Sequence, residues 1–264
     1  MIRAPRRIVC LSAEAADWLW RIGAWDSVVG VTAHFSPQPD TPPKPRVSSF
    51  STARFDGIVA LEPDFVITFS DVQATLGAEL VKRGLSVLAT NQRTLSEIEA
   101  TLALLGRVVG REHEAEKCLR EFRQRLAPVE SNAPRPRVYF EEWNDPFISG
   151  IAWVSELIER AGGEDIFADF RQCRAAAQRV VTSKQICHAD PEVIIASWCG
   201  KPVRMDEIAA RPGWDKITAV RSDRIYEIPG DDILQPGFRL VHGYENLKEI
   251  IGGPAKCNRF HELV

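Results

Sequence analysis

The sequence predicts an α/β protein with two Rossmann-like lobes, each built around a parallel sheet, and a ligand cleft between them. Short apolar runs alternate with helical patterns in both halves of the chain. A long helical pattern separates the halves, and a short helix–acid–Pro–acid–strand pattern recurs at residues 61–64 and 189–192. We therefore expect lobes at residues 1–93 and 130–264, joined by a single bridging helical segment at residues 94–129.

The first half has strands and helices of similar length in regular alternation. Apolar runs bounded by glycine or proline predict the strands, and apolar positions at helical spacing predict the helices. The expected strands are 8–11, 28–31, 65–69 and 87–89, and the expected helices are 14–22, 54–61 and 76–83. Residues 36–45 contain five prolines and predict a stiff loop.

The segment between the halves begins with a capping box, in which Thr94 is followed three residues later by Glu97. Apolar residues then recur at helical spacing, Gly110 interrupts them, and Pro128 ends the second stretch. A helix of about 16 residues is about 24 Å long, which is enough to bridge two lobes. An ordinary crossover helix is the alternative.

The second half repeats the rhythm of the first. The expected strands are 137–141, 193–197 and 225–228, and the expected helices are 154–161, 183–189, 205–211 and 240–251. The shared pattern of helix, acid, proline, acid and strand suggests that the two halves are structurally related. Residues 257–264 match no pattern that predicts a role.

Composition excludes several classes of protein. The chain has 264 residues, 45% of them hydrophobic, and a formal charge of −3, so no basic excess indicates a nucleic-acid partner. No run approaches the roughly 20 apolar residues of a membrane span, and the six scattered cysteines are not a disulfide framework. The first residues lack the apolar region of a signal peptide. We expect a monomer that remains in the cytoplasm if Met1 is the native start.

Motifs that would indicate an enzyme are missing. The sequence has no G-x-G-x-x-G, no G-K-[ST] and no G-x-S-x-G segment. The five histidines stand singly, without the spacing of a metal site. No catalytic residue and no catalytic cofactor is therefore predicted. His34 and His242 are candidates for contact with a ligand or for an axial bond to its metal, and surface histidines are the alternative.

Large aromatic side chains stand where ligands bind to parallel sheets, beyond the carboxyl ends of the strands. Phe69, Trp143 and Trp198 each follow or end a predicted strand. Phe50 precedes a predicted helix, and Phe147 lies in a loop. Such a set suits a broad, flat ligand with a few polar groups that fix its orientation. The alternative is that these rings only cover the core of each sheet.

Six segments resemble one family: RIVCLS at 7–12, VGVT at 29–32, IVALEPDFVI at 58–67, DPFISG at 145–150, AGGEDIF at 161–167 and LQPGFRL at 234–240. The first three resemble the helical-backbone, or class III, substrate-binding proteins of ABC importers for vitamin B12, ferric siderophores and haem. The last three look most like the cobalamin-binding branch. The similarity spans about residues 6–251.

The resemblance implies a corrinoid held between two lobes with little domain closure. Phe50 and Phe69 fall where B12-binding relatives place tryptophans of the cleft, and Phe147 falls where they place another aromatic residue. The LQPGFRL segment adds Gln235 and Arg239 as polar contacts. Trp143 and Trp198 are predicted as ligand contacts only from their positions at the ends of strands, and not from the resemblance. Cobalamin or a related corrinoid is thus the expected ligand.

The resemblance also implies an ABC permease as partner, docked through one acidic residue on each lobe. Asp56 occupies the first of these positions, but Lys184 occupies the second. Arginines of the permease would repel a lysine. The sequence therefore leaves two roles open, a component of a periplasmic B12 importer or a corrinoid carrier that is not exported.

Two other functions compete with corrinoid binding. A ferric siderophore would need several arginines at the site, for which only Arg179 and Arg239 are suitable, and haem would need His34 or His242 as a ligand to iron. An enzyme on a nitrogenase-like scaffold of two lobes is the alternative of another class, and the dispersed cysteines disfavour the metal centre it would need.

Overall fold

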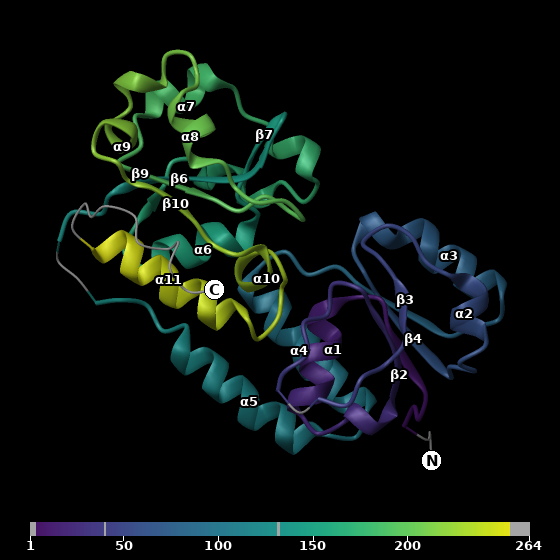
Figure 1. Cartoon of the computed structure of the whole chain (residues 1–264). Coiled ribbons are helices and arrows are strands. Elements are labelled where there is room, and N and C mark those ends of the chain that lie inside the picture. The colour runs from purple at the N-terminus through teal and green to yellow at the C-terminus, as the bar shows by residue number, and fades with distance from the viewer. Residues whose placement is uncertain (1–3, 40, 131–132, 254–264) are drawn as a thin grey trace. The chain divides into compact units, whose positions relative to one another are not determined.

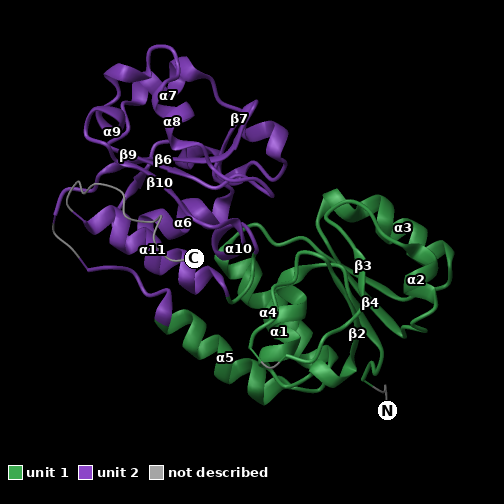
Figure 2. Cartoon of the chain, viewed as in Figure 1, with its two compact units in different colours: residues 1–124, 236–238 green, residues 125–235, 239–264 purple. Residues whose placement is uncertain are grey.

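The computed structural model describes residues 4–39, 41–130 and 133–253, and residues 257–264 lie outside this range. The chain forms two compact units, which are coloured separately in Figure 2. Lobe 1 comprises Met1–Gln124 with Pro236–Phe238, and lobe 2 comprises Arg125–Gln235 with Arg239–Val264. Each lobe is an α/β unit with its own sheet, as the sequence predicts.

Lobe 1 is built around a parallel sheet with strand order β3-β2-β1-β4-β5. Figure 1 shows α1 and α4 on one face of this sheet and α2 and α3 on the other. The elements are β1 (Ile8–Cys10), α1 (Ala13–Arg21), β2 (Val28–Thr32), β3 (Arg46–Ser48), α2 (Phe55–Val59), β4 (Phe65–Phe69), α3 (Ala74–Lys82), β5 (Val87–Thr90), α4 (Leu95–Val108) and α5 (Glu112–Arg125).

The centre of this sheet explains why its apolar runs are strands. Val9 of β1 lies beside Val66 of β4, and both side chains are fully buried. Helices cover both faces, so each central strand needs apolar residues on both sides and the sequence shows a continuous run rather than an alternation. β3 pairs with β2 at the edge of the sheet. The sequence does not predict β3, because Arg46–Ser48 has no apolar run.

Lobe 2 has a mixed sheet in which β10, β9 and β6 are parallel neighbours. On the other side of β6, β8 pairs parallel with its beginning and β7 pairs antiparallel with its end. The elements are β6 (Arg137–Asn144), β7 (Phe147–Ser149), α6 (Ala152–Arg160), β8 (Glu164–Asp165), α7 (Ser183–Ala189), β9 (Val193–Ala196), α8 (Met205–Ala209), α9 (Thr218–Arg221), β10 (Ile225–Glu227), α10 (Gly230–Ile233) and α11 (Leu240–Gly252). The prediction of a parallel sheet is therefore right except for β7.

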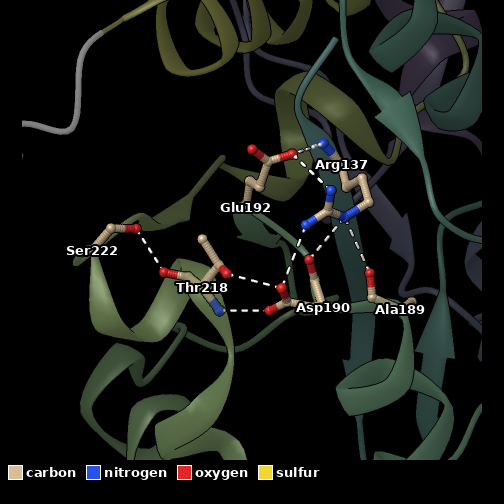
Figure 3. Close-up of polar contacts among 6 residues, drawn as sticks. All are labelled: Arg137, Ala189, Asp190, Glu192, Thr218 and Ser222. Atoms are coloured by element: carbon tan, nitrogen blue, oxygen red, sulfur yellow. Dashed lines mark hydrogen bonds and ion pairs between the residues drawn. The ribbon is translucent and has the colours of Figure 1, made fainter. Parts of the chain in front are cut away.

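The recurring acid–Pro–acid pattern forms the same structure in both lobes. In lobe 2, Asp190 ends α7 with a left-handed backbone (φ 46°) and Pro191 follows. The Arg137 Nε–H donates to the carbonyl oxygens of Ala189 (3.2 Å) and Asp190 (2.9 Å). The Glu192 carboxylate accepts the Arg137 backbone N–H at 3.0 Å (Figure 3). An arginine at the start of β6 thus closes the end of α7 against the sheet.

Lobe 1 has the same arrangement, in which Arg7 corresponds to Arg137 of lobe 2 and Glu62 corresponds to Asp190. Glu62 has φ 46°, and the Arg7 Nε–H donates to the carbonyl oxygens of Leu61 (3.0 Å) and Glu62 (3.1 Å). The Asp64 carboxylate accepts the Arg7 backbone N–H at 3.0 Å. The strand orders β5-β4-β1-β2 and β10-β9-β6-β8 also correspond. The prediction that the halves are structurally related is confirmed.

Asp190→Asn is expected to destabilise lobe 2 by about 1 kcal/mol at neutral pH. Hydrogen bonds from the backbone N–H and hydroxyl of Thr218 lower the pKa of Asp190. A carboxyl whose pKa is lower in the folded state than in the unfolded state stabilises the fold at pH values above its unfolded pKa of about 3.9. This stabilisation is lost as the pH falls through the folded pKa. Denaturant unfolding should therefore show the deficit at pH 7 and not near pH 2. Asp215→Asn, at an exposed position, is the control.

The segment predicted to bridge the lobes consists of two helices. Thr94 and Glu97 form the predicted capping box at the start of α4, with the Glu97 N–H 3.2 Å from the Thr94 hydroxyl. Gly110, with φ 67°, separates α4 from α5. The boundary between the lobes falls at the end of α5, between Gln124 and Arg125. Among the described residues, no helix combines the length and the apolar character that crossing a membrane requires.

Candidate functional site

The carboxyl edge of lobe 1 carries Phe50 and Phe69. The buried side chain of Gln73 forms hydrogen bonds to the backbone of both. The Gln73 amide N–H₂ donates to the carbonyl oxygens of Leu11 (2.9 Å) and Phe50 (3.0 Å), and its oxygen accepts the Phe69 N–H (2.9 Å). Gln73 is buried and its amide is fully engaged, so it joins the ends of β1 and β4 to the loop of Phe50. Its sequence surroundings give no signal of this role.

Phe50 and His34 lie together at this edge. The Phe50 side chain is 46% exposed, and its ring meets the His34 ring edge to face at a centroid distance of 6.2 Å. His34 Nε2 lies 3.2 Å from the Ser49 hydroxyl. Phe69 is half-buried, and the Arg93 guanidinium lies 5.5 Å from its ring centre. Lobe 1 thus places three of the predicted contacts, His34, Phe50 and Phe69, on one edge.

In lobe 2, Trp143 is near the end of β6 and partly exposed. The Lys201 ammonium group lies 4.1 Å from the centre of its ring, within the range of a cation–π contact. The same ammonium group donates to Asn144 Oδ1 at 2.6 Å. Trp143 therefore presents a flat ring at the edge of lobe 2, with a positive charge beside it.

Trp198 does not lie on the exposed edge where the sequence predicts it. Its side chain is only 4% exposed, and its indole N–H donates to Glu141 Oε1 at 3.0 Å. Burial of a tryptophan is favourable when its N–H finds an acceptor. The structure therefore assigns Trp198 to the core of lobe 2, and its predicted direct contact with a ligand is not supported by its position.

The acceptor, Glu141, is fully buried and pairs with Arg211 at 2.6 and 2.8 Å through two parallel hydrogen bonds. Tyr139 donates its hydroxyl hydrogen to Glu141 at 3.1 Å. Burial and the Glu141 charge raise the pKa of Tyr139 well above its ordinary value, so the hydroxyl keeps its proton. This polar group, centred on Glu141, supports the strand that carries Trp143.

Phe147, on β7, is half-buried and packs against Arg211, the partner of Glu141. The Arg211 guanidinium lies 4.6 Å from the centre of its ring and 4.5 Å from that of Trp214. The rings of Phe147 and Trp214 are 5.8 Å apart. Arg211 thus joins the buried carboxylate of Glu141 to a predicted ligand contact, and the sequence gives no indication of this.

The two arginines predicted for a siderophore are engaged within lobe 2. Arg179 is 1% exposed and makes two hydrogen bonds to the Glu142 carboxylate, at 2.7 and 2.9 Å. Arg239 donates to Asp232 Oδ1 at 2.7 Å and to the carbonyl oxygen of Asp231 at 3.3 Å. The Arg179 guanidinium is therefore not available to an anionic ligand.

Gln235 and Arg239 meet at α10, as their shared sequence segment suggests. The Gln235 amide donates to Asp231 Oδ1 at 2.9 Å, and Arg239 bonds to the neighbouring Asp232. His242 lies in α11, within the predicted helix 240–251, with its Nδ1 3.7 Å from the Glu245 carboxylate. Polar groups that could face a ligand thus gather around the short helix α10.

Gly243→Ala is expected to destabilise lobe 2 by about 1–3 kcal/mol. A Cβ at Gly243 would lie 2.4 Å from the carbonyl oxygen of Asp232, and a backbone atom cannot rotate away. α10, which carries Asp231 and Asp232, would have to move. Gly252→Ala in the same helix is the control, because no described atom lies within 4 Å of the added Cβ there. It should gain up to about 1 kcal/mol in denaturant unfolding. Destabilisation by both substitutions would contradict this explanation.

The two predicted docking positions are equivalent in the repeated structure. Asp56 is the second residue of α2 and Lys184 the second residue of α7, and both are exposed. Each precedes the left-handed residue of its lobe, Glu62 or Asp190, by six positions (62 − 56 = 190 − 184 = 6). The reversal of charge therefore occurs at matching places on the two lobes. Among the described residues, no cluster of three or more histidine, cysteine and acidic side chains could hold a metal ion.

Named proteins from bacteria and archaea are similar to this chain over most of its length. An uncharacterized ABC transporter substrate-binding lipoprotein of Bacillus subtilis is 24% identical, over 94% of this chain and 81% of its own length. A cobalamin-binding protein of Halobacterium salinarum is 26% identical, over 92% of this chain and 70% of its own length.

Solved structures share the fold. The periplasmic vitamin B12 binding protein of Vibrio cholerae superposes with a TM-score of 0.71 at 23% identity, covering 94% of this chain and 97% of that one. A periplasmic heme-binding protein of Roseiflexus in apo form gives a TM-score of 0.77 at 19% identity, with 93% and 97% covered. The family model described as periplasmic binding protein matches residues 8–231. This chain belongs to the periplasmic binding protein family.

Proposed function

We propose that the chain binds cobalamin or a related corrinoid with the aromatic edges of its two lobes. The observation that carries the proposal is the presence of flat side chains at both carboxyl edges, Phe50 and Phe69 on lobe 1 and Trp143 and Phe147 on lobe 2. Polar side chains support them, the buried Gln73 on lobe 1 and the partly buried Arg211 on lobe 2. A corrin ring offers broad apolar faces to such rings and amide groups to the polar residues beside them.

The relatives support this choice of ligand. The Halobacterium protein is named for cobalamin, and the Vibrio structure is of a vitamin B12 binding protein. The polar groups around α10, which include Gln235 and Arg239, could bond to the amide side chains of a corrinoid. Trp198 would not touch the ligand itself. It would help to hold Glu141, which supports the strand that carries Trp143.

Calorimetric titration of the purified chain with cyanocobalamin tests the proposal. We expect saturation at one corrinoid per chain and a loss of affinity of about tenfold or more in Phe69→Ala and in Trp143→Ala, because each removes a ring that the ligand would cover. Leu104→Ala, at an exposed apolar position on α4, should bind as the unchanged chain does. The absence of saturable binding to both cyanocobalamin and hydroxocobalamin would refute corrinoid binding.

His34 is our candidate for an axial bond to cobalt. Its ring lies at the exposed edge beside Phe50, whereas His242 lies on α11 beside Glu245. Hydroxocobalamin has an exchangeable axial ligand and cyanocobalamin holds its own firmly. A shift of the corrin absorption bands with hydroxocobalamin alone, lost in His34→Ala, would support this role.

Haem is the second candidate ligand, and a neighbouring structure is that of a heme-binding protein. The pairing of an exposed histidine with an aromatic ring on lobe 1 favours it as well, because both could contact a metalloporphyrin. Titration with hemin, followed by its Soret band, distinguishes the two ligands. Binding of hemin in preference to both cobalamins would replace the corrinoid proposal.

We propose the role of a substrate-binding component of an ABC importer, with a corrinoid carrier that is not exported as the alternative. The Bacillus relative is named as such a component. The opposite charges of Asp56 and Lys184 at matching positions imply a partner with a basic group facing α2 and an acidic group facing α7. A permease that is basic at both places would bind more tightly to Lys184→Glu than to the unchanged chain.

A further inference from the structure

A pocket of about 400 Å³ lies at the edge of the lobe 1 sheet, beside β3. The chain reverses here, since the Ser49 N–H donates to the carbonyl oxygen of Thr52 (2.8 Å) and the Arg54 N–H to that of Val47 (2.9 Å). Ser48 and Ala53 form an antiparallel bridge across the reversal. The backbone around the pocket is therefore fixed by its own hydrogen bonds.

Two arginines from the two arms of this reversal line the pocket. Arg46 donates through Nη1 to the carbonyl oxygen of Ala33, and Arg54 donates through Nη2 to that of Arg46. Each bond uses one N–H group and leaves others for a further acceptor. No carboxylate among the described residues forms an ion pair with either guanidinium, in contrast to arginines such as Arg21, Arg93 and Arg211.

Hydroxyl groups complete the lining. Ser48, Ser49 and Thr52 also line the pocket. The Ser48 side chain is buried, and its oxygen has no hydrogen-bond partner among the described residues. A buried hydroxyl without a partner is uncommon and indicates that an acceptor is missing. The lining therefore offers positive charge and hydrogen-bond donors without a matching negative group.

We propose that this pocket binds a phosphate group, with Arg46 and Arg54 as its two cationic ligands. Planar guanidinium groups match the oxygens of a phosphate through paired hydrogen bonds, which are stronger than bonds between neutral groups. An anion would also relieve the repulsion between two cations that line one small pocket.

The phosphate could be the phosphodiester in the nucleotide loop of cobalamin or free inorganic phosphate. The first source rests on the proposed function, because it requires that the chain binds a corrinoid. The pocket lies beside His34 and Phe50, since Ser49 contacts the His34 ring and Phe50 follows Ser49 in the chain. A corrinoid stacked on Phe50 would bring its nucleotide loop within reach of this pocket.

The direct test is an NMR titration of the full chain with inorganic phosphate at constant ionic strength, with chloride as the reference anion. We expect saturable shifts of the Arg46 and Arg54 Nε–H signals, which single Arg→Lys variants identify. Arg46→Gln/Arg54→Gln should abolish the phosphate-dependent shifts of nearby backbone signals. Lys82→Gln/Arg107→Gln removes the same charge from exposed helix positions of lobe 1 and should leave them unchanged. Equal responses to phosphate and chloride would overturn the proposal.

The source of the phosphate follows from a comparison of cobalamin with cobinamide, which has the same corrin ring and no phosphodiester. If the pocket binds the nucleotide loop, Arg46→Gln/Arg54→Gln should weaken cobalamin binding about tenfold, the effect expected for a hydrogen-bonded charge, and leave cobinamide binding unchanged. Equal effects on both ligands, with phosphate shifts present, would assign the pocket to free phosphate. Failure of both corrinoids to bind would refute the proposed function and leave the phosphate titration decisive for the pocket.

Discussion

Arg211→Met is expected to destabilise lobe 2 by about 3–5 kcal/mol, the cost of leaving one member of a buried ion pair without its partner. Glu141 is fully buried, and its two oxygens accept from Arg211 at 2.6 and 2.8 Å. Methionine fills part of the space but gives the carboxylate no compensating charge. Denaturant unfolding followed by tryptophan fluorescence measures the loss.

Two further variants distinguish the charge effect from lost packing. Glu141→Gln/Arg211→Met removes both charges and should recover most of the stability, because the penalty belongs to the unpaired carboxylate. Arg204→Met removes an exposed arginine that pairs with Asp206 and Glu207, and should change stability by less than about 0.5 kcal/mol. If the single and double variants at Arg211 are equally unstable, the charge explanation is wrong.

Arg211 also connects this buried pair to the proposed ligand contacts. Its guanidinium lies 4.6 Å from the ring centre of Phe147 and 4.5 Å from that of Trp214. In the double variant, which should be folded, Phe147 would lose a cation at its face and much of its fixed orientation. We therefore expect weaker corrinoid binding in the double variant even where its stability is restored.

The sequence predicts the central strands well, because burial on both faces requires continuous apolar runs. β1, β4, β6 and β9 all lie within the predicted ranges or overlap them closely. The edge strands β3, β7 and β8 have only two or three residues each and no such run. Their pairing is decided by neighbouring strands rather than by their own composition.

The candidate site is predicted only in part. The position of an aromatic residue at the end of a strand predicts Phe69 and Trp143, because carboxyl ends of parallel strands meet at one edge. The strand-end position also predicts an exposed Trp198, but the Trp198 side chain is buried in the core. Its indole N–H donates there to Glu141, which belongs to another strand. Gln73 and Arg211 act through partners distant in the sequence, which no local pattern reveals.

Glu14 is a further residue whose surroundings no local sequence pattern reveals. The sequence places it in the first turn of a helix, where a carboxylate is favoured and usually solvated. In the structure, Glu14 is buried and Gly237, from the Pro236–Phe238 segment of lobe 1, packs against it: a Cβ added at Gly237 would lie 2.7 Å from the Glu14 Cβ. Burial raises the pKa of Glu14 to about 7. The segment that buries it comes from near the other end of the chain.

Lobe 1 is therefore expected to lose about 3 kcal/mol of stability between pH 4.5 and pH 7 through Glu14. A carboxyl whose folded pKa is raised favours the folded state while it is protonated. This contribution is complete below the unfolded value of 4.5 and declines as the pH rises to the folded value of about 7. Glu14→Gln removes the charge, so it should match the unchanged chain near pH 4 and exceed it in stability at pH 8.

Denaturant unfolding at a series of pH values gives the difference between the two chains and cancels the titration of all other groups. Glu112→Gln, at an exposed position on α5, should show a nearly constant difference from the unchanged chain over the same range. Parallel curves for Glu14→Gln and the unchanged chain from pH 4 to pH 8 would mean that water reaches the carboxylate. The close packing of Gly237 on Glu14 would then not persist in solution, because a solvated carboxylate has no reason to keep a raised pKa.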